Sequence, residues 1–182
     1  MRTGRSVFIN AMSKFSAPPG HSLTSARSLN PGGWIEVKDI RLPIEDNDTS
    51  FPEGCAVRKW TELILEGAEK MGRPLNSAIK YKTQLKEAGF HNVREEIFRW
   101  PQNQWPKDAK PKELGKLSRP FHHLRTNEIG MWMCENFTSG LSGLSMALFT
   151  RGLGWTPEEI EAFLVTVRKD MKDTKIRGYY TM

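Results

Sequence analysis

The sequence predicts an α/β fold, in which a few strands form a partial sheet with helices packed beside it. Three observations predict this class. A segment rich in β-branched residues, Trp34–Ile40, follows the run Asn30–Gly33, whose proline and glycines end any preceding helix. Apolar residues then repeat at helical spacing over long stretches. A second strand candidate, Val93–Trp100, follows a helix that Gly89 ends. With 182 residues, of which 38% are hydrophobic, the chain suits one domain.

Residue patterns in the first half of the chain predict a strand, a loop and two helices. The strand at Trp34–Ile40 precedes a segment, Arg41–Gly54, whose prolines and acids predict a loop. An amphipathic helix is predicted over Cys55–Met71, because Val57, Trp60, Ile64 and Ala68 share one face. A second helix is predicted over Asn76–Ala88.

The second half begins with the strand Val93–Trp100 and continues into a helix that carries Phe137 to Leu148. Another helix starts at Thr156, since Pro157 suits a first turn and Glu159 completes a capping box. The region Lys175–Tyr180 is predicted to begin a last strand.

Residues 1–24 are predicted to be a basic, disordered tail. Residues 1–30 hold Arg2, Arg5, Lys14 and Arg27 and no acid, so they carry most of the net charge of +6. This Arg-rich, Ser-rich composition also fits a transit peptide, which would target residues 1–20 to mitochondria, or a misassigned first exon. Because the rest of the chain is nearly balanced, a basic nucleic-acid-binding module is the least favoured function, and we expect no nucleic-acid partner.

The cysteines and histidines predict no disulfide and no metal site. Cys55 and Cys134 are far apart and match no metal-ligand spacing, which is typical of reduced thiols in a protein of the cytoplasm or nucleus. His122 and His123 are adjacent and would point to opposite faces of a strand. No apolar run approaches the roughly 20 residues of a membrane span, so we expect no membrane partner.

Several runs of residues occur in a characteristic order: PGGWIEVKD (31–39), GRPL (72–75), LKEAGF (85–90), WPKD (105–108), ELG (113–115), ALFTR (147–151), LGW (153–155) and VRKDMKD (167–173). In these runs the chain resembles the C-terminal half of the fungal LaeA-like class I S-adenosylmethionine (SAM) methyltransferases. The resemblance implies that residues 25–182 are the C-terminal part of a methyltransferase domain. Its Rossmann-like sheet would be partial, with the family's fifth and sixth strands and the start of the last. It also implies SAM as cofactor and a connection to secondary metabolism.

The resemblance does not extend to the cofactor loop. Such enzymes hold SAM through a glycine-rich turn after the first strand and an acid after the second. Here Gly152–Gly154 follows a predicted helix, and Gly140–Gly143 lies inside one. We therefore assign no cofactor-binding residue and leave the catalytic residues unknown. We expect a truncated methyltransferase that is inactive and binds no SAM alone.

One internal segment departs from the family pattern. Residues 116–129 interrupt the family sequence and are either a genuine loop or a translated, unspliced intron.

Candidate substrate contacts follow from the resemblance. Asp39 and Arg41 lie at the carboxyl end of a strand, where open α/β sheets bind ligands, and Trp105 is a further candidate at the edge of the methyl-acceptor site. Trp100, Trp105 and Trp155 would line an acceptor pocket or, as the favoured alternative, pack in the core.

A different class of function remains open, namely a non-catalytic regulatory or interaction protein. A truncated sheet leaves an exposed strand edge, which favours a protein partner that completes the sheet. By resemblance, a velvet-type regulator is a second candidate for that partner.

Overall fold

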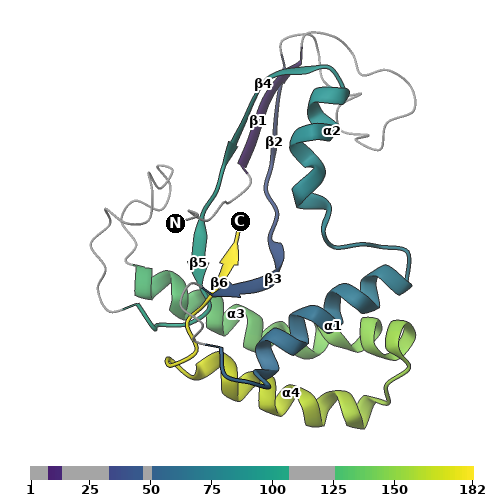
Figure 1. The fold of residues 1–182 in the computed structure, drawn as a ribbon, viewed down its shortest axis with the longest axis vertical. Coiled ribbons are helices and arrows are strands. Elements are labelled where there is room, and N and C mark those ends of the chain that lie inside the picture. The colour runs from purple at the N-terminus through teal and green to yellow at the C-terminus, as the bar shows by residue number, and fades with distance from the viewer. Residues whose placement is uncertain (1–7, 14–32, 47–50, 107–125) are drawn as a thin grey trace.

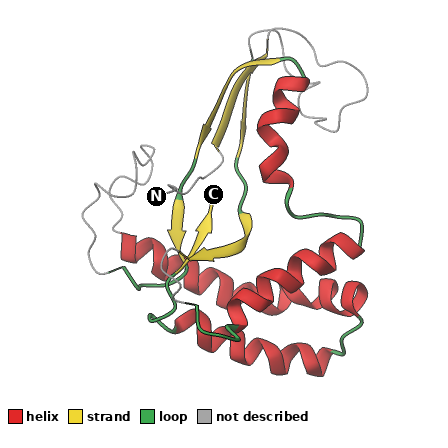
Figure 2. Cartoon of the chain, viewed as in Figure 1, coloured by secondary structure: helices red, strands yellow, loops and turns green. Residues whose placement is uncertain are grey.

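The computed structural model describes residues 8–13, 33–46, 51–106 and 126–182. Figures 1 and 2 show a small layer of strands that stands on a bundle of helices. A 3-10 turn at Ser77–Lys80 precedes α2, and a π-helix at Leu148–Leu153 follows α3. The strands and helices follow in the order β1 (Phe8–Ser13), β2 (Trp34–Val37), β3 (Arg41–Asp46), α1 (Ala56–Lys70), α2 (Tyr81–Glu87), β4 (Phe90–Glu96), β5 (Arg99–Pro101), α3 (Thr126–Ala147), α4 (Pro157–Lys172) and β6 (Gly178–Thr181).

The strands form two three-stranded sheets, with the orders β2-β1-β4 and β3-β6-β5. Every hydrogen-bonded pair is antiparallel, so the two outer strands of each sheet run parallel to one another. The chain passes from β2 into β3 and from β4 into β5, so the two sheets continue one another along their outer strands (Figure 1). The middle strand is β1 in one sheet and β6 in the other. The predicted α/β class with a small partial sheet is confirmed.

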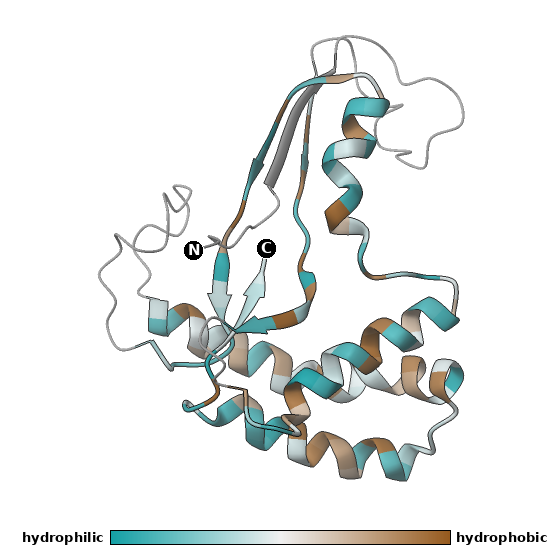
Figure 3. Ribbon diagram, in the orientation of Figure 1, coloured by the Kyte–Doolittle hydropathy of each residue, from teal (hydrophilic) through white to brown (hydrophobic). Residues whose placement is uncertain are grey.

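The hydrophobic core lies where α1, α3 and α4 pack together beneath the sheet that contains β6 (Figure 1). Apolar residues recur along these helices among polar ones, as Figure 3 shows. The largest fully buried side chains there include Trp60, Tyr180, Phe149, Leu141 and Ile160. Large aromatic residues thus supply much of the buried area, because each removes more surface from water than an aliphatic side chain does.

Helix α1 begins and ends within one residue of its predicted bounds, and α4 begins one residue after its predicted start at Thr156. The α4 capping box is confirmed: the Glu159 N–H donates to Thr156 Oγ1 (3.2 Å), and the Thr156 N–H donates to the Glu159 carboxylate (2.8 Å). The predicted stripe of α1 is buried at Val57, Trp60 and Ile64. These helices are predictable because their caps and stripes are local features.

Strand β3 corrects one prediction. The prolines and acids of Arg41–Gly54 predict a loop, yet Arg41–Asp46 pairs with β6, with Arg41 opposite Thr181 and Glu45 opposite Tyr179. Pairing with a strand far along the chain overrides the local composition. Pro43 is compatible with β3 because this strand stands at the end of its sheet, where one side of the backbone has no strand neighbour among the described residues.

Strand β1 corrects a second prediction. Residues 1–24 are predicted to be a disordered tail, but Phe8–Ser13 within that segment forms the middle strand between β2 and β4. A strand in that position satisfies backbone groups of both neighbours at once, which local composition does not reveal. The remaining residues of the predicted tail lie outside the described residues.

The segment 116–129 is described only at its end. Thr126 to Ile129 form the first turn of α3, and Ile129 is buried in the core. His122, His123 and the rest of the predicted insertion lie outside the described residues.

None of the helices in the described ranges is both long and apolar enough to cross a bilayer.

Candidate functional site

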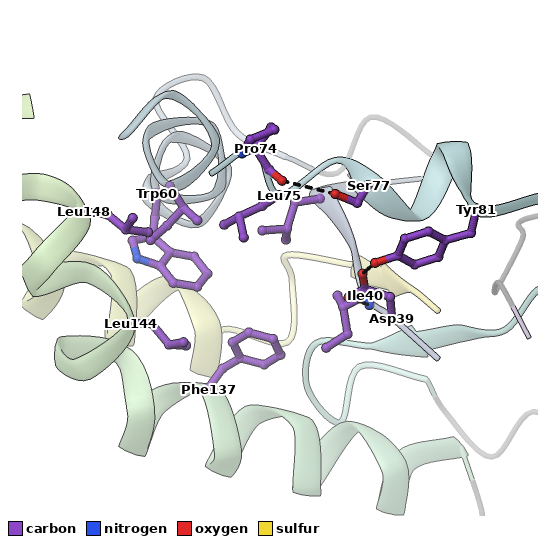
Figure 4. A pocket seen from close by; sticks show the side chains of 12 residues that line it. Asp39, Ile40, Trp60, Pro74, Leu75, Ser77, Tyr81, Phe137, Leu144 and Leu148 are labelled. Atoms are coloured by element: carbon purple, nitrogen blue, oxygen red, sulfur yellow. Dashed lines mark hydrogen bonds between the residues drawn. The ribbon is translucent and has the colours of Figure 1, made fainter. Parts of the chain in front are cut away.

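A pocket of about 320 Å³ opens where the sheet meets the helices. Its walls come from the link between β2 and β3, the start of β3, α1, the stretch 74–81, α3 and the π-helix. Figure 4 shows these segments facing one another, with α1 and α3 on one side and the β2–β3 link on the other. The pocket is therefore a product of tertiary packing, because its walls come from three parts of the chain that lie far apart in sequence: residues 39–42, residues 60–81 and residues 137–148.

The wall formed by α1 and α3 is apolar and fixed in place. Trp60 is 1% exposed, and its indole N–H donates to Ser145 Oγ (2.8 Å). The Ser145 hydroxyl in turn donates to the carbonyl of Leu141 (2.7 Å). Phe137 meets Trp60 edge to face at 6.1 Å and stacks on Tyr180 at 4.2 Å. The indole is thus held by a buried hydrogen bond and by aromatic packing.

The opposite edge is polar and is built around Asp39. The Tyr81 hydroxyl donates to Asp39 Oδ2 (2.7 Å), and the Ile40 N–H donates to Oδ1 (2.8 Å), as the close-up in Figure 4 shows for the tyrosine. Burial, the hydrogen bond to Asp39 and the charge of that carboxylate raise the pKa of Tyr81 to about 12. Tyr81 is therefore protonated at neutral pH and acts as a donor.

The rim of the pocket is apolar and open. Leu75 and Leu144 line it and are 42% and 49% exposed, so the pocket reaches solvent at these two residues. Near the same rim, the Ser77 hydroxyl donates to the Pro74 carbonyl (3.3 Å), which satisfies its own polar group. The pocket is mainly hydrophobic with few polar groups, the usual character of a small-molecule site.

The structure separates the three predicted substrate contacts. Asp39 lines the pocket, whereas Arg41, which opens β3, does not. Trp105 lies elsewhere, in a second, open cavity of about 530 Å³ that also contains Lys175 and Arg177. Its indole N–H donates to the Gly178 carbonyl (3.2 Å), and its ring meets Tyr179 edge to face at 5.0 Å.

The other tryptophans of the predicted pocket belong to the packing around the core. Trp155 packs against Phe149 and Phe163 at centroid distances of 5.3 and 5.6 Å, and Trp100 packs against the core cluster. This is the alternative that the sequence favours. Trp60 is the tryptophan that lines the pocket.

Sequence reasoning missed most of the pocket. Trp60 and Tyr81 occupy apolar faces of predicted helices, where a core role is the ordinary interpretation. The one available signal is Tyr81 itself, since a tyrosine on such a face needs a partner for its hydroxyl when it is buried. Nothing in the sequence indicates that this partner is Asp39.

Neither of the two glycine pairs considered in the sequence forms the turn that holds SAM in methyltransferases. Gly152 belongs to the π-helix, and a Cβ added there would lie 2.6 Å from the Gly67 carbonyl oxygen, so this glycine serves helix packing. Gly154 caps that helix in a left-handed conformation (φ 76°), and Gly140 and Gly143 lie inside α3. In the described ranges neither glycine pair follows a strand, so neither forms the phosphate-loop type of turn that approaches a nucleotide.

Other reactive groups do not assemble into a site. No cluster of three or more His, Cys, Asp or Glu side chains suited to a metal ion exists in the part of the chain that is described. Cys55 and Cys134 are both free thiols, and burial is the main cause that raises the pKa of each. Raised pKa values keep these thiols protonated and poorly nucleophilic.

Comparisons with known proteins find fungal methyltransferases and secondary metabolism regulators. A probable methyltransferase, tdiE, of Emericella nidulans is 31% identical over 153 residues, which are 84% of this chain and 44% of that protein. The secondary metabolism regulator LAE1 of Cochliobolus heterostrophus is 28% identical over 83% of this chain and 45% of its own length. The protein-methionine methyltransferase laeA of Chaetomium globosum is 25% identical over 85% of this chain and 44% of its own length.

The chain thus spans less than half the length of each of these relatives. No family model matches the chain. No solved structure matches it significantly.

Proposed function

Because the chain belongs to the fungal LaeA-like methyltransferases, a family that uses SAM and is linked to secondary metabolism, we propose that it supplies the methyl-acceptor side of such an enzyme. The pocket between α1, α3 and the β2–β3 link would hold the acceptor. The cofactor would be held by residues outside the described part or by another polypeptide.

One observation carries this proposal: the polar edge of the pocket lies directly after β2. By the family resemblance β2 belongs to an open α/β sheet, and such sheets bind ligands at the carboxyl ends of their parallel strands. Strand β2 runs parallel to β4, the other outer strand of its sheet. Asp39 stands two residues beyond Val37, the last residue of β2, and it faces a cavity whose other walls are apolar. Methyl transfer asks mainly for alignment of donor and acceptor, so a shaped acceptor pocket is the contribution that these residues can make.

A regulatory role with a protein partner is the second candidate. Strands β2 and β3 stand at the ends of their sheets among the described residues, and Trp34 on β2 is 55% exposed. An open strand edge beside an exposed aromatic residue favours pairing with a strand of another chain. A polypeptide that completes the sheet, or a velvet-type regulator, would fill this role.

The free thiols bear on the cellular compartment of the protein. Two free cysteines suit a reducing environment, so we place the protein in the cytoplasm or nucleus. Fluorescence of a tagged chain in fungal cells tests this, and accumulation in mitochondria would instead support targeting by residues 1–20.

The first experiment separates acceptor from cofactor binding. We expect SAM to give no saturable heat in calorimetry with the 182-residue chain. A saturable isotherm would overturn the division of roles proposed here.

The second experiment tests the pocket in a complete enzyme. A chimera joins this chain to the part of tdiE that the match does not cover, and radiolabel is followed from SAM into an organic extract of fungal culture. We expect Leu75→Trp, which fills the pocket mouth, to abolish transfer while SAM binding is kept. The matched control is Ile79→Trp, because Ile79 is 55% exposed on the same stretch and does not line the pocket. Transfer that survives Leu75→Trp would contradict the proposal.

A further inference from the structure

We propose that the pocket selects ligands in which an apolar, ring-shaped body carries a protonated amine, and that the Asp39 carboxylate recognises that amine. The inference rests on the proposed function, since it names the chemical class of acceptor that the same pocket would take.

The body of the ligand is specified by the walls. Trp60 and Phe137 present aromatic surfaces, and Ile40, Ile64 and Leu148 supply aliphatic ones. A cavity of about 320 Å³ lies at the small end of ligand sites, which range over roughly 300–1,000 Å³. A flat bicyclic ring suits such walls, because it buries apolar area against both aromatic residues.

The head group is specified by the charge of Asp39. Its two hydrogen-bond donors, the Tyr81 hydroxyl and the Ile40 N–H, are both neutral. In the described part of the chain, no ion pair joins this carboxylate to a lysine, arginine or histidine. The negative charge at the edge of the apolar pocket is therefore not neutralised by a described residue.

Asp39 also keeps room for a further donor. Each oxygen of an ionised carboxylate accepts about two hydrogen bonds, and each oxygen of Asp39 accepts one from the described protein groups. A protonated amine supplies both the missing donor and the missing charge, whereas an anionic ligand would be repelled.

Tyr81 acts as a positioning residue for this recognition. It approaches from the start of α2 and holds Oδ2 of Asp39 at 2.7 Å, as Figure 4 shows. The phenol is a donor to the carboxylate at neutral pH, so it orients Asp39 without cancelling its charge.

Three probes test the inference. They share an indole ring and differ in the charge of the terminal group: cationic tryptamine, its neutral alcohol analogue tryptophol, and anionic indole-3-propionate. Calorimetry on the full 182-residue chain measures their affinities at neutral pH. The Trp60 indole N–H signal in nuclear magnetic resonance, assigned with Trp60→Phe, reports whether they occupy this pocket. We expect tryptamine to bind about tenfold more tightly than tryptophol, and the propionate most weakly, because hydrogen bonds to charged groups are the stronger ones.

Two variants separate the charge from the shape. Asp39→Asn keeps the size of the side chain and should reduce the preference for tryptamine to within about threefold. Tyr81→Phe removes the positioning donor and keeps the carboxylate, so the affinity for tryptamine should fall while its preference over tryptophol remains. If Asp39→Asn fails to fold, the comparison of the three probes on the wild-type chain still tests the role of the carboxylate.

The outcomes distinguish this inference from the proposed function. Equal binding of tryptamine and tryptophol, or a preference that survives Asp39→Asn, overturns the role of the carboxylate and leaves the pocket as an acceptor site. Failure of every probe to shift the Trp60 signal overturns the ligand class, while the radiolabel experiment with Leu75→Trp still decides the proposed function.

Discussion

The carboxylate of Asp170, near the end of α4, accepts a hydrogen bond of 2.7 Å from the backbone N–H of Ala56, the first residue of α1. The residue before it, Cys55, makes no side-chain cap of its own. A helix start leaves backbone N–H groups without partners and favours a nearby negative charge. Asp170 therefore caps α1 from another helix and joins the two elements that carry much of the core.

Removal of this cap should destabilise the fold. We expect Asp170→Ala to lower the free energy of unfolding by about 1–2 kcal/mol, the range for lost helix caps. Asp170→Asn keeps an acceptor oxygen and loses the charge, so its loss should be smaller, about 0.5 kcal/mol. Urea unfolding measures both. Thr166→Ala, at an exposed position of α4, should be nearly neutral, and an equal loss there would refute the capping role.

A matched pair of glycines in α3 tests the contact between that helix and the segment after β5. A Cβ at Gly130 would overlap the Asn103 carbonyl group, whereas one at Gly143 meets nothing within 4 Å. Asn103 cannot move away easily, because its side-chain N–H groups donate to the carbonyls of Met171 and Asp173, each at 2.9 Å. We expect Gly130→Ala to cost about 3 kcal/mol and Gly143→Ala to gain about 0.5–1 kcal/mol. Thermal unfolding of both variants checks the opposite signs.

The buried hydrogen bond that orients Trp60 should be costly to break. Ser145→Ala leaves the indole N–H without a partner in a fully buried position, so we expect a loss of about 1–3 kcal/mol. Ser139→Ala removes an exposed hydroxyl in the same helix, whose bond to the Asn136 carbonyl is 3.1 Å, and should have little effect. Chemical denaturation compares the two, and a similar small loss in both would show that the indole does not depend on Ser145.

The Tyr81 hydroxyl should lose its proton only at high pH, and this should add to the loss of folding stability in alkali. Its folded pKa of about 12 lies above the ordinary value of 10.0, so its contribution to stability is complete below pH 10 and is lost as pH rises from 10 to 12. Tyr81→Phe should therefore make the loss of stability over that range shallower. Near-ultraviolet absorbance of phenolate, as a difference between the wild type and Tyr81→Phe, follows the group directly.

Asp39→Asn provides the companion measurement for that titration. Without the carboxylate charge, the pKa of Tyr81 should fall back toward its ordinary value. Tyr180, which is fully buried and has a raised pKa of its own, does not contact Asp39 and should be unaffected. If the pKa of Tyr81 is the same in Asp39→Asn as in the wild type, burial alone sets that pKa.

Local signals predicted several elements well. The stripe from Val57 to Ala68 and the Thr156–Glu159 box lie within a few residues of one another in sequence, so they report on a helix without knowledge of its surroundings. Local signals do not reveal the role of Asp170. Its carboxylate accepts a hydrogen bond from Ala56, which lies 114 residues earlier in the chain.

Strands were harder to predict than helices. The loop-like composition of Arg41–Asp46 and the tail-like composition of Phe8–Ser13 both hide strands, because a strand forms where backbone partners exist. Those partners are β6 for the first segment, and β2 and β4 for the second.

The sequence by itself determined the α/β class and the positions of α1 and α4, which depend on residue types at short spacings. The resemblance of its ordered runs of residues indicated the family and made Asp39 a candidate, and Asp39 does line the pocket. Only the tertiary structure decided that Trp105 and Arg41 lie outside the pocket and that Trp60 and Tyr81 lie in it. The reason is physical: the pocket exists only where the sheet link, α1 and α3 are brought together, and the partner of each polar group is chosen by that packing.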